Sequence, residues 1–385
     1  MHSKKIICFL LVTALVFAAT PTVFATEIPA VSAQSAVLYE PQSGRFLYEK
    51  QADKRRAMAS TTKLMTALVA AEILPMQKDI TVPTEAVLVE GTALGLRGGD
   101  TISVKDLLVG MLLSSGNDAA NVLALQCGGS LPAFAQKMNQ KAALLGMTQT
   151  QFVTPSGLDA TGHLSTARDM AYLGAAVLQV PILAEICAAK QQTVQFGNPK
   201  RTVTLKNHNR LLSLYPDAIG LKTGFTKKAG RCLVSAARRN GVTLVAVTLH
   251  ASDDWNDHIA LYEYGFSQMV SIKPSVPLLP SLSVAGGEKT KVSLTVTAPK
   301  PIILMKNEQN EISTLVTLPV HIWAPVAAGD TVGSVTYQLG SRVLQTVPIL
   351  AEESIAMRIE KSFYQKWVQQ LMLLLKSIIG VKTWQ

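Results

Sequence analysis

The spacing of apolar positions changes along the chain, and each spacing predicts a different kind of element. Residues 36–39 and 46–48 are apolar around a polar turn, which predicts a β-hairpin. A long middle region places apolar residues three and four apart, which predicts helices at 64–69, 104–113, 118–127, 131–145 and 166–180. The β-branched runs 231–237 and 242–249 predict a second hairpin, and a helix is expected at 254–269.

This order of hairpin, helices, hairpin and helix indicates an α+β fold. We expect the N-terminal and C-terminal strands to share one antiparallel sheet, with the 64–69 helix packed on it. The middle helices then form a separate lobe. A cleft between lobe and sheet is where a binding site is expected.

The pattern changes again after a proline-rich stretch at 273–280, which reads as a linker. Short apolar or alternating runs separated by Gly, Pro and Asn predict a small all-β domain, with strands at 291–296, 302–304, 312–318, 332–339 and 343–349. The predicted units after residue 25 are therefore a domain at 26–272, a β-rich domain at 273–350 and a terminal segment at 351–385.

The terminal segment has the pattern of an amphipathic helix. Residues 354–385 carry five basic residues and one glutamate, a charge of +4, and apolar residues follow helical spacing at Ile359, Phe363, Trp367, Leu371, Leu374 and Ile378. The uninterrupted apolar run 371–375 is far too short to span a bilayer, so we expect a helix that lies in the membrane surface. The alternative is a helix docked on its own protein.

The N-terminus predicts export. Lys4 and Lys5 precede an apolar run at 6–19, and Val-Phe-Ala precedes Thr26, which is the pattern of a signal peptide at 1–25. A retained anchor is the alternative, but the apolar run is shorter than a membrane span requires. We expect an exported, extracytoplasmic protein attached peripherally to the outer face of the cytoplasmic membrane.

Composition excludes several kinds of function. The 385 residues are 48% hydrophobic and 16% charged, which suits a globular chain of two or three domains. The net charge of +10 falls to +8 without Lys4 and Lys5, and no basic and aromatic interleaving indicates nucleic acid as a partner. Beyond the signal peptide, three scattered cysteines lack metal-ligand spacing, so neither a disulfide framework, nor a metal, nor a cofactor is expected.

Candidate chemistry begins with Ser60-Thr61-Thr62-Lys63. On a helix this spacing places Ser60 and Lys63 on one face, where a neutral lysine amine could take the proton of the serine hydroxyl. Ser60 would then be a nucleophile. The alternative is a helix cap beside a solvated lysine, because Ser-x-x-Lys arises by chance roughly once in a chain of this size.

Two further polar clusters lie downstream. Ser115 and Asn117, in Ser-Ser-Gly-Asn-Asp, stand between two predicted helices and are expected to point into the cleft. Lys222-Thr223-Gly224 offers a cation, a hydroxyl and a glycine that permits close backbone approach, which suits an extended anionic ligand on an edge strand. The alternatives are a helix-to-helix loop with a cap and an ordinary turn before a strand.

The order Ser-x-x-Lys, Ser-x-Asn, Lys-Thr-Gly resembles the penicillin-recognising serine hydrolases. Within that group the chain resembles the low-molecular-mass D-alanyl-D-alanine carboxypeptidases from about Ser35 to Met269. The motifs that carry this resemblance lie at 59–66, 155–158, 163–170, 207–211 and 220–226. The family also has a β-rich domain and an amphipathic membrane anchor after its catalytic domain.

The resemblance implies a β-lactamase/transpeptidase-like fold and an enzyme that needs no cofactor. It would remove the terminal D-alanine from peptidoglycan stem pentapeptides, limit cross-linking, and bind β-lactams as covalent inhibitors. Ser60 would attack the carbonyl of the penultimate D-alanine, Lys63 would be the base, and Ser115 would pass the proton to the departing amine.

The resemblance also implies substrate-binding roles. Asn117 would orient Lys63 and hold the substrate amide. Lys222 would keep Lys63 deprotonated and attract the terminal carboxylate, while Thr223 hydrogen-bonds that carboxylate. Gly224 permits close approach, and the backbone N–H groups of Ser60 and Phe225 would form the oxyanion hole. No arginine follows 249–251, where some relatives have one, so a second carboxylate anchor is unassigned.

Two competing functions differ in testable ways. A serine β-lactamase needs a fast deacylation base, and the only glutamate between Asn117 and Lys222 is Glu185, without its accompanying asparagine. A non-catalytic wall-binding protein would not need every motif side chain. Histidines are expected to be structural, at His163, His208 and His250, and Arg168 and Asp169 are expected to brace the lobe.

Overall fold

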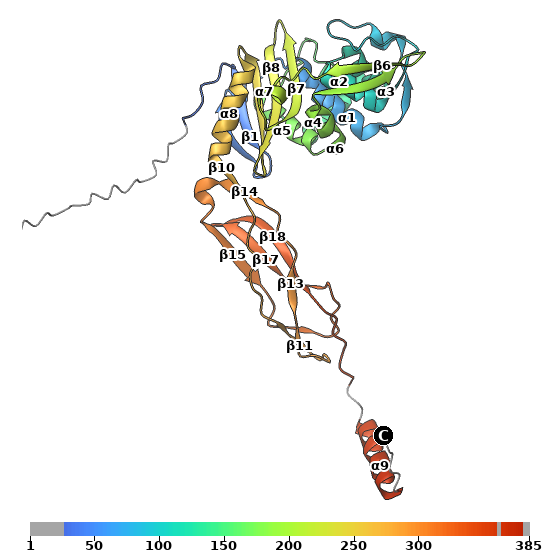
Figure 1. The fold of residues 1–385 in the computed structure, drawn as a ribbon, viewed down its shortest axis with the longest axis vertical. Coiled ribbons are helices and arrows are strands. Elements are labelled where there is room, and N and C mark those ends of the chain that lie inside the picture. Colours follow the sequence, from blue (N-terminus) through green and yellow to red (C-terminus); the bar gives the residue numbers. More distant parts are fainter. Residues whose placement is uncertain (1–26, 360–362, 380–385) are drawn as a thin grey trace, which may run out of the picture.

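The computed structural model describes residues 27–359 and 363–379. It has a mixed α and β head, a narrower β-rich stalk and a terminal helix at the far end of the stalk (Figure 1). The predicted signal peptide lies outside the described residues. The predicted α+β class is confirmed, because helices cover an antiparallel sheet in the head and an all-β region follows it.

The central sheet of the head joins the two ends of its sequence. Its strand order is β2-β1-β9-β8-β7, all antiparallel. The strands are β1 (Ser35–Glu40), β2 (Arg45–Lys50), β7 (Ala218–Thr226), β8 (Gly230–Arg239) and β9 (Val242–Ala251). β8 is buried from Cys232 to Ala237, since both faces of the sheet are covered by helices.

Each face of the sheet packs on a different helix set. Leu233 belongs to the cluster formed with α8 (Asp254–Gln268), whereas its neighbour Val234 belongs to the larger core of the helical lobe. The lobe consists of α1 (Lys63–Ile73), α2 (Val104–Leu113), α3 (Asn117–Gly128), α4 (Leu131–Leu144), α5 (Ala167–Leu178) and α6 (Pro181–Ala188). A short helix, α7 (Leu211–Leu214), precedes β7. Residues 63–70 of α1 are all buried, so the lobe is built around this helix.

The lobe also holds a four-stranded sheet that the apolar spacing did not predict. It has the order β3-β4-β5-β6, from β3 (Asp79–Thr81), β4 (Thr101–Ser103), β5 (Gln191–Phe196) and β6 (Arg201–Lys206). β3 and β4 have three residues each, and β5 and β6 are mainly polar and exposed. Such strands carry too few apolar positions to show a period.

The stalk contains three small sheets. One pairs β10 (Met269–Ile272) with β14 (Ile302–Met305), and a second joins β12 (Lys291–Val292), β11 (Leu282–Ala285) and β16 (His321–Trp323). The third has the order β13-β18-β17-β15, from β13 (Leu294–Val296), β15 (Ile312–Thr317), β17 (Thr331–Leu339) and β18 (Arg342–Ala351). The predicted single strand at 291–296 was wrong, because β12 and β13 belong to different sheets.

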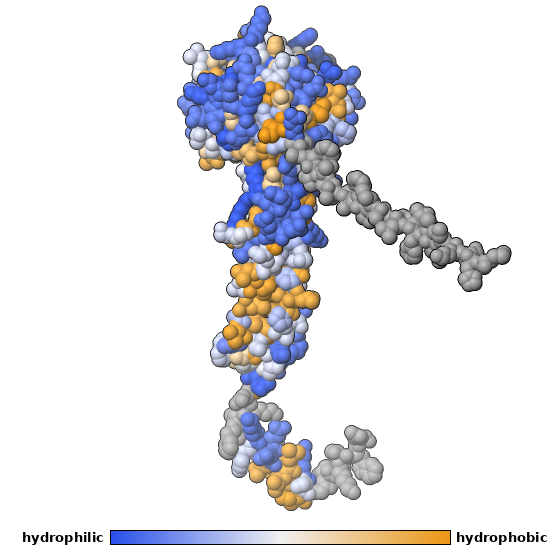
Figure 2. Space-filling model, turned by 90° about the vertical axis from the view of Figure 1, so that its left-hand side faces the viewer, coloured by the Kyte–Doolittle hydropathy of each residue, from blue (hydrophilic) through white to orange (hydrophobic). Residues whose placement is uncertain are grey.

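Figure 2 shows hydrophobic residues gathered on the side of the stalk that carries β15. Leu315, Val320 and Trp323 are exposed in this part of the chain. The terminal helix α9 (Phe363–Ile379) also exposes most of its described apolar side chains. Within the residues that the structure describes, no single helix is long and apolar enough to cross a membrane; α5 and α6 pass that test only as a pair bent by 104°.

Candidate active site

Ser60 and Lys63 lie side by side where a short helical turn leads into α1. Ser60 belongs to the 3₁₀ turn η1 (Ala59–Thr62), and Lys63 is the first residue of α1. Lys63 Nζ lies 2.9 Å from Ser60 Oγ, 2.7 Å from Asn117 Oδ1 and 2.6 Å from the Ser156 carbonyl oxygen. Two sequence motifs therefore meet at one amine, together with a carbonyl from a third segment.

This arrangement suits a neutral Lys63. A neutral amine has two N–H donors and one lone pair. Asn117 Oδ1 and the Ser156 carbonyl can only accept, so they take both N–H donors. The lone pair is then left for the hydroxyl proton of Ser60, which makes Lys63 able to act as a base.

The surroundings of Lys63 favour the neutral form. Burial holds the pKa of Lys63 well below its usual range, the charge of Lys222 lowers it further, and Asp118 opposes both effects. The side chain is completely buried. A lysine in its neutral form can accept a proton from a serine hydroxyl without a histidine.

The Ser-x-Asn motif is tied to a loop that forms one wall of the site. Asn117 Nδ2 donates to the Glu90 carbonyl at 2.6 Å, and its backbone N–H donates to the Thr92 carbonyl at 2.8 Å. The carboxylate of Asp118 accepts four backbone N–H groups, from Leu94, Gly95 and Leu96 of this loop and from Ala119. The sequence did not predict this function of Asp118, because an aspartate that caps its own helix and one that binds a distant loop have the same sequence pattern.

Ser115 lines the same cleft, with a backbone φ of 64°. In the part of the chain that the structure describes, Ser115 makes no hydrogen bond to Ser60 or Lys63. Ser115 is therefore placed at the cleft by its backbone position, among the residues that a substrate would contact.

The segment around Ser156 and His163 packs against the backbone next to Ser60. Gly157 has φ +87°, and a Cβ atom there would lie 2.0 Å from the Ala59 carbonyl oxygen, so only glycine fits. His163 Nδ1 accepts from the Val153 N–H at 2.9 Å, which leaves Nε2 to donate to Thr62 Oγ1 at 2.9 Å. Burial lowers the pKa of His163 to about 4, so this histidine is a neutral structural brace.

The third motif lies on β7, at the edge of the central sheet. Thr223, Gly224 and Phe225 line the cleft, and a Cβ at Gly224 would lie 2.8 Å from the Ser60 backbone nitrogen. Lys222 is different. It is 1% exposed, its Nζ donates to the Thr223 carbonyl at 3.0 Å, and burial lowers its pKa to about 8. Lys222 therefore lies beneath the cleft wall and acts on the site through its charge.

These residues enclose a cleft of about 420 Å³ between the helical lobe and the sheet. The cleft is lined by Ser60, Thr92, Ser115, His208, Thr223, Gly224, Phe225, Arg231, Asp254 and Trp255. A larger pocket of about 490 Å³ lies between the β1–β2 turn and the stalk, but it contains none of the motif residues. Among the described residues, no cluster of His, Cys, Asp and Glu side chains is arranged to hold a metal ion.

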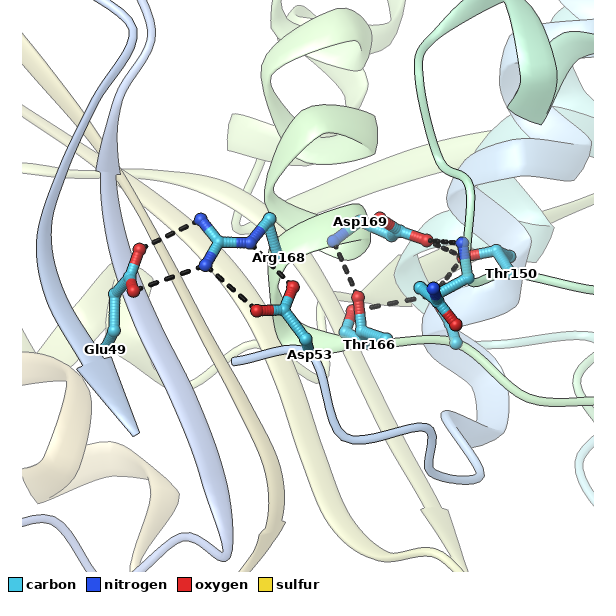
Figure 3. A network of polar contacts seen from close by, with 8 residues as sticks. Glu49, Asp53, Thr150, Thr166, Arg168 and Asp169 are labelled. Carbon is cyan, nitrogen blue, oxygen red and sulfur yellow. Dashed lines mark hydrogen bonds and ion pairs between the residues drawn. The ribbon is translucent and has the colours of Figure 1, made fainter. Parts of the chain in front are cut away.

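Polar contacts of Arg168 and Asp169 brace the beginning of α5 (Figure 3). Arg168 Nε donates to Asp53 at 2.7 Å, and its Nη1 donates to Glu49 on β2 at 2.9 Å. Asp169 accepts from the Thr150 hydroxyl at 2.7 Å, while its own N–H donates to the Thr166 hydroxyl at 3.0 Å. Arg168 thus holds α5 against the β1–β2 hairpin and the residues after it, and Asp169 ties α5 to the segment around Thr150, so both residues brace the lobe as expected.

The chain is similar to proteins of known class. Residues 22–253 match the D-alanyl-D-alanine carboxypeptidase family, and residues 278–356 match the C-terminal domain of penicillin-binding protein 5. The D-alanyl-D-alanine carboxypeptidase DacF of Bacillus subtilis is 30% identical over 91% of this chain and 95% of its own length. DacC of Escherichia coli is 33% identical over 89% of this chain and 90% of its own.

Solved structures agree with these sequence relatives. Penicillin-binding protein 5 from Haemophilus influenzae has a TM-score of 0.65 and 28% identity, over 86% of this chain and 99% of that protein. The Streptomyces K15 DD-transpeptidase has a TM-score of 0.60 and 32% identity, over 62% of this chain and 98% of that protein. The chain belongs to the D-alanyl-D-alanine carboxypeptidase family of penicillin-binding serine hydrolases.

Proposed function

We propose that Ser60, Lys63 and Ser115 carry out the carboxypeptidase reaction of this family on peptidoglycan stem pentapeptides. The observation that carries the proposal is the hydrogen-bond set of Lys63, whose two acceptors leave its lone pair facing Ser60. As Ser60 Oγ attacks the carbonyl carbon of the penultimate D-alanine, its proton moves to Lys63 Nζ. The product of this addition is a tetrahedral intermediate.

The oxyanion of that intermediate would be held by the backbone N–H groups of Ser60 and Phe225. Gly224 supports this assignment, because a side chain there would collide with the Ser60 backbone nitrogen and block the approach of the substrate. One oxyanion-hole donor contributes about 3 kcal/mol in comparable enzymes. Phe225 would contribute its backbone N–H to this function, and the residue as a whole is 66% exposed.

Collapse of the intermediate breaks the C–N bond and leaves an acyl ester on Ser60. The departing D-alanine nitrogen takes a proton, which Lys63 supplies through the Ser115 hydroxyl at the cleft wall. Water then attacks the ester carbonyl, and Ser60 regains its proton as the shortened peptide leaves. Asn117 holds Lys63 in place through these steps.

Release of D-alanine from a pentapeptide tests this proposal. The wild-type chain should release one D-alanine per peptide, and Ser60→Ala should abolish release. Ser213→Ala, at an exposed serine of α7, is the matched control and should keep wild-type activity. Undiminished release by Ser60→Ala would contradict the assignment of the nucleophile.

The β-lactamase alternative is not favoured. Glu185 is exposed on α6 and does not line the cleft, so it cannot activate water beside Ser60. We therefore expect a β-lactam to acylate Ser60 and to leave slowly. Turnover of many β-lactam molecules per second would contradict this expectation.

We also propose that the mature chain is exported and attached to the outer face of the cytoplasmic membrane by α9. The exposed apolar residues Leu371, Leu374 and Ile378 and the adjacent lysines support this proposal. Leu371→Asp with Leu374→Asp should release the protein from vesicles of phosphatidylglycerol and phosphatidylcholine. Val343→Asp, at an exposed apolar residue of the stalk, is the control and should bind like wild type.

A further inference from the structure

Lys222 of the Lys-Thr-Gly motif does not offer its amine to a ligand in the cleft. Lys222 is 1% exposed, and its amine donates to the backbone carbonyl of the following residue. Among the described residues, those that line the cleft do not include Lys222. A substrate carboxylate in the cleft would therefore feel the field of Lys222 but would need another group for direct charged contact.

Arg231 stands where such a contact is possible. It is the one lysine or arginine among the described residues that line the cleft, and its side chain is 42% exposed. In the sheet it pairs with Phe225 on β7, two positions beyond Thr223. The guanidinium is therefore supplied by the strand next to the Lys-Thr-Gly strand.

Asp254 and Trp255, at the start of α8, hold this arginine. Asp254 is buried, with 4% of its side chain exposed, and its Oδ1 accepts from Arg231 Nε at 2.7 Å and forms an ion pair with Nη2. The guanidinium carbon lies 5.5 Å from the centre of the Trp255 ring. The carboxylate and the ring together fix the orientation of the side chain.

One edge of the guanidinium remains for a ligand. Arginine carries five N–H donors in a planar fork, and Asp254 uses those on Nε and Nη2 only. In the described part of the chain, Nη1 has no hydrogen-bond partner. A carboxylate is the group that such a fork binds best, because it accepts two parallel hydrogen bonds.

We propose that Arg231 is a specificity-determining residue that binds the free C-terminal carboxylate of the departing D-alanine, together with the Thr223 hydroxyl. Asp254 is the positioning residue that orients it. This inference rests on the proposed function and adds to it a reason for selecting free peptide ends. A peptide whose terminal carboxylate is blocked would offer no charged group to the edge of Arg231 that Asp254 leaves free.

The test compares two substrates on the full chain. One is a pentapeptide ending in D-Ala-D-Ala, and the other is the same peptide with a terminal carboxamide; release of D-alanine or D-alaninamide is measured. Arg231→Gln should lower kcat/KM for the free acid roughly 10- to 100-fold. The same substitution should change kcat/KM for the amide by less than about threefold, since a neutral amide gains little from a cation. The ratio of kcat/KM for the free acid to kcat/KM for the amide should therefore fall.

Arg238→Gln is the matched control, because it removes the same charge from an exposed position of the same strand. It should keep the wild-type ratio. Arg231→Gln leaves Asp254 buried without its partner, so Arg231→Gln with Asp254→Asn is the second variant, and it should show the same lowered ratio. An unchanged ratio in a folded variant of either kind would overturn the inference.

The outcomes separate this inference from the proposed function. If the wild-type chain released no D-alanine from the free acid, the proposed function itself would fail. If the wild type were active and Arg231→Gln lowered the rates for acid and amide equally, only the function of Arg231 would be refuted. Such a result would show that Arg231 supports the cleft without reading the carboxylate.

Discussion

Gly157→Ala should damage catalysis without touching a catalytic side chain. Gly157 has φ +87°, and a methyl group there would lie 2.0 Å from the carbonyl oxygen and 2.5 Å from the carbonyl carbon of Ala59. Ala59 directly precedes Ser60, and its own φ is 47°. The substitution therefore acts on the backbone that sets the position of the nucleophile.

The magnitude follows from these two features. A non-glycine residue with left-handed backbone angles costs about 1–2 kcal/mol, and overpacking against backbone costs about 1–3 kcal/mol, so we expect a loss of stability of roughly 2–5 kcal/mol. Atoms 2.0 Å apart must separate by roughly 1.4 Å or more to reach an ordinary van der Waals contact. A displacement of that size in a reacting group can cost about 100-fold in rate.

Gly146→Ala is the control for backbone strain. Gly146 also has a positive φ, of +74°, but a methyl group there meets nothing within 4 Å. We expect a stability loss of about 1–2 kcal/mol and an unchanged rate of acylation. The assay is the rate of Ser60 acylation by a fluorescent penicillin, measured on protein whose folding is checked by circular dichroism. A folded Gly157→Ala protein that acylates within threefold of the wild-type rate would refute the reasoning.

Three further predictions concern charge and hydrogen bonding. Lys63 acts when neutral, so kcat/KM should rise as the pH increases through the lowered pKa of Lys63. The charge of Lys222 lowers this pKa, so Lys222→Gln should raise it and move the rising part of the pH–rate profile to higher pH. Asn117→Ala removes an acceptor from Lys63 and a tether to the Glu90 carbonyl, and should reduce the acylation rate more than tenfold in stopped-flow assays, whereas an unchanged rate would count against it. Burial lowers the pKa of His258 to about 3, so below about pH 6.5 the unfolded chain binds a proton at this residue that the folded chain does not bind. The free energy of unfolding should therefore fall as the pH drops from about 6.5 towards 3. In denaturant titrations, His258→Gln should reduce the pH dependence of this free energy by up to about 1.4 kcal/mol per pH unit.

The elements of this chain that are rich in buried apolar residues could be predicted from its sequence. Helix α2 has the predicted limits, Val104–Leu113, because eight of its ten residues are buried and give a clear apolar pattern. The paired strands β8 and β9 were also recognised, since central strands covered on both faces are continuously apolar. Long-range packing reinforces the local pattern in all three elements.

The environment of the site could be predicted only in part. The three motifs identify Ser60, Lys63 and Asn117, whose side chains meet in the structure. The Ser156 carbonyl was not predicted as a partner of Lys63, because every residue has a carbonyl and only the fold selects one. Arg231 and Asp254 were also missed as a pair, since they lie on a strand and a helix that become neighbours only when the sheet is covered.

The strand pattern failed where elements are short or polar. β3 and β4 span three residues each, so hydrophobic alternation cannot be recognised in them. β5 exposes most of its glutamines and buries only Val194 and Phe196. These strands exist because the lobe provides partners for them, which is information that a local pattern does not contain.

Mass spectrometry of the trapped acyl-enzyme tests the central claim most directly. The full chain is incubated with benzylpenicillin, quenched in acid, digested with trypsin and fragmented. The account predicts one penicilloyl group per chain, carried by the tryptic peptide of residues 57–63 and localised to Ser60. An adduct on another residue, or the same adduct formed by Ser60→Ala, would contradict it.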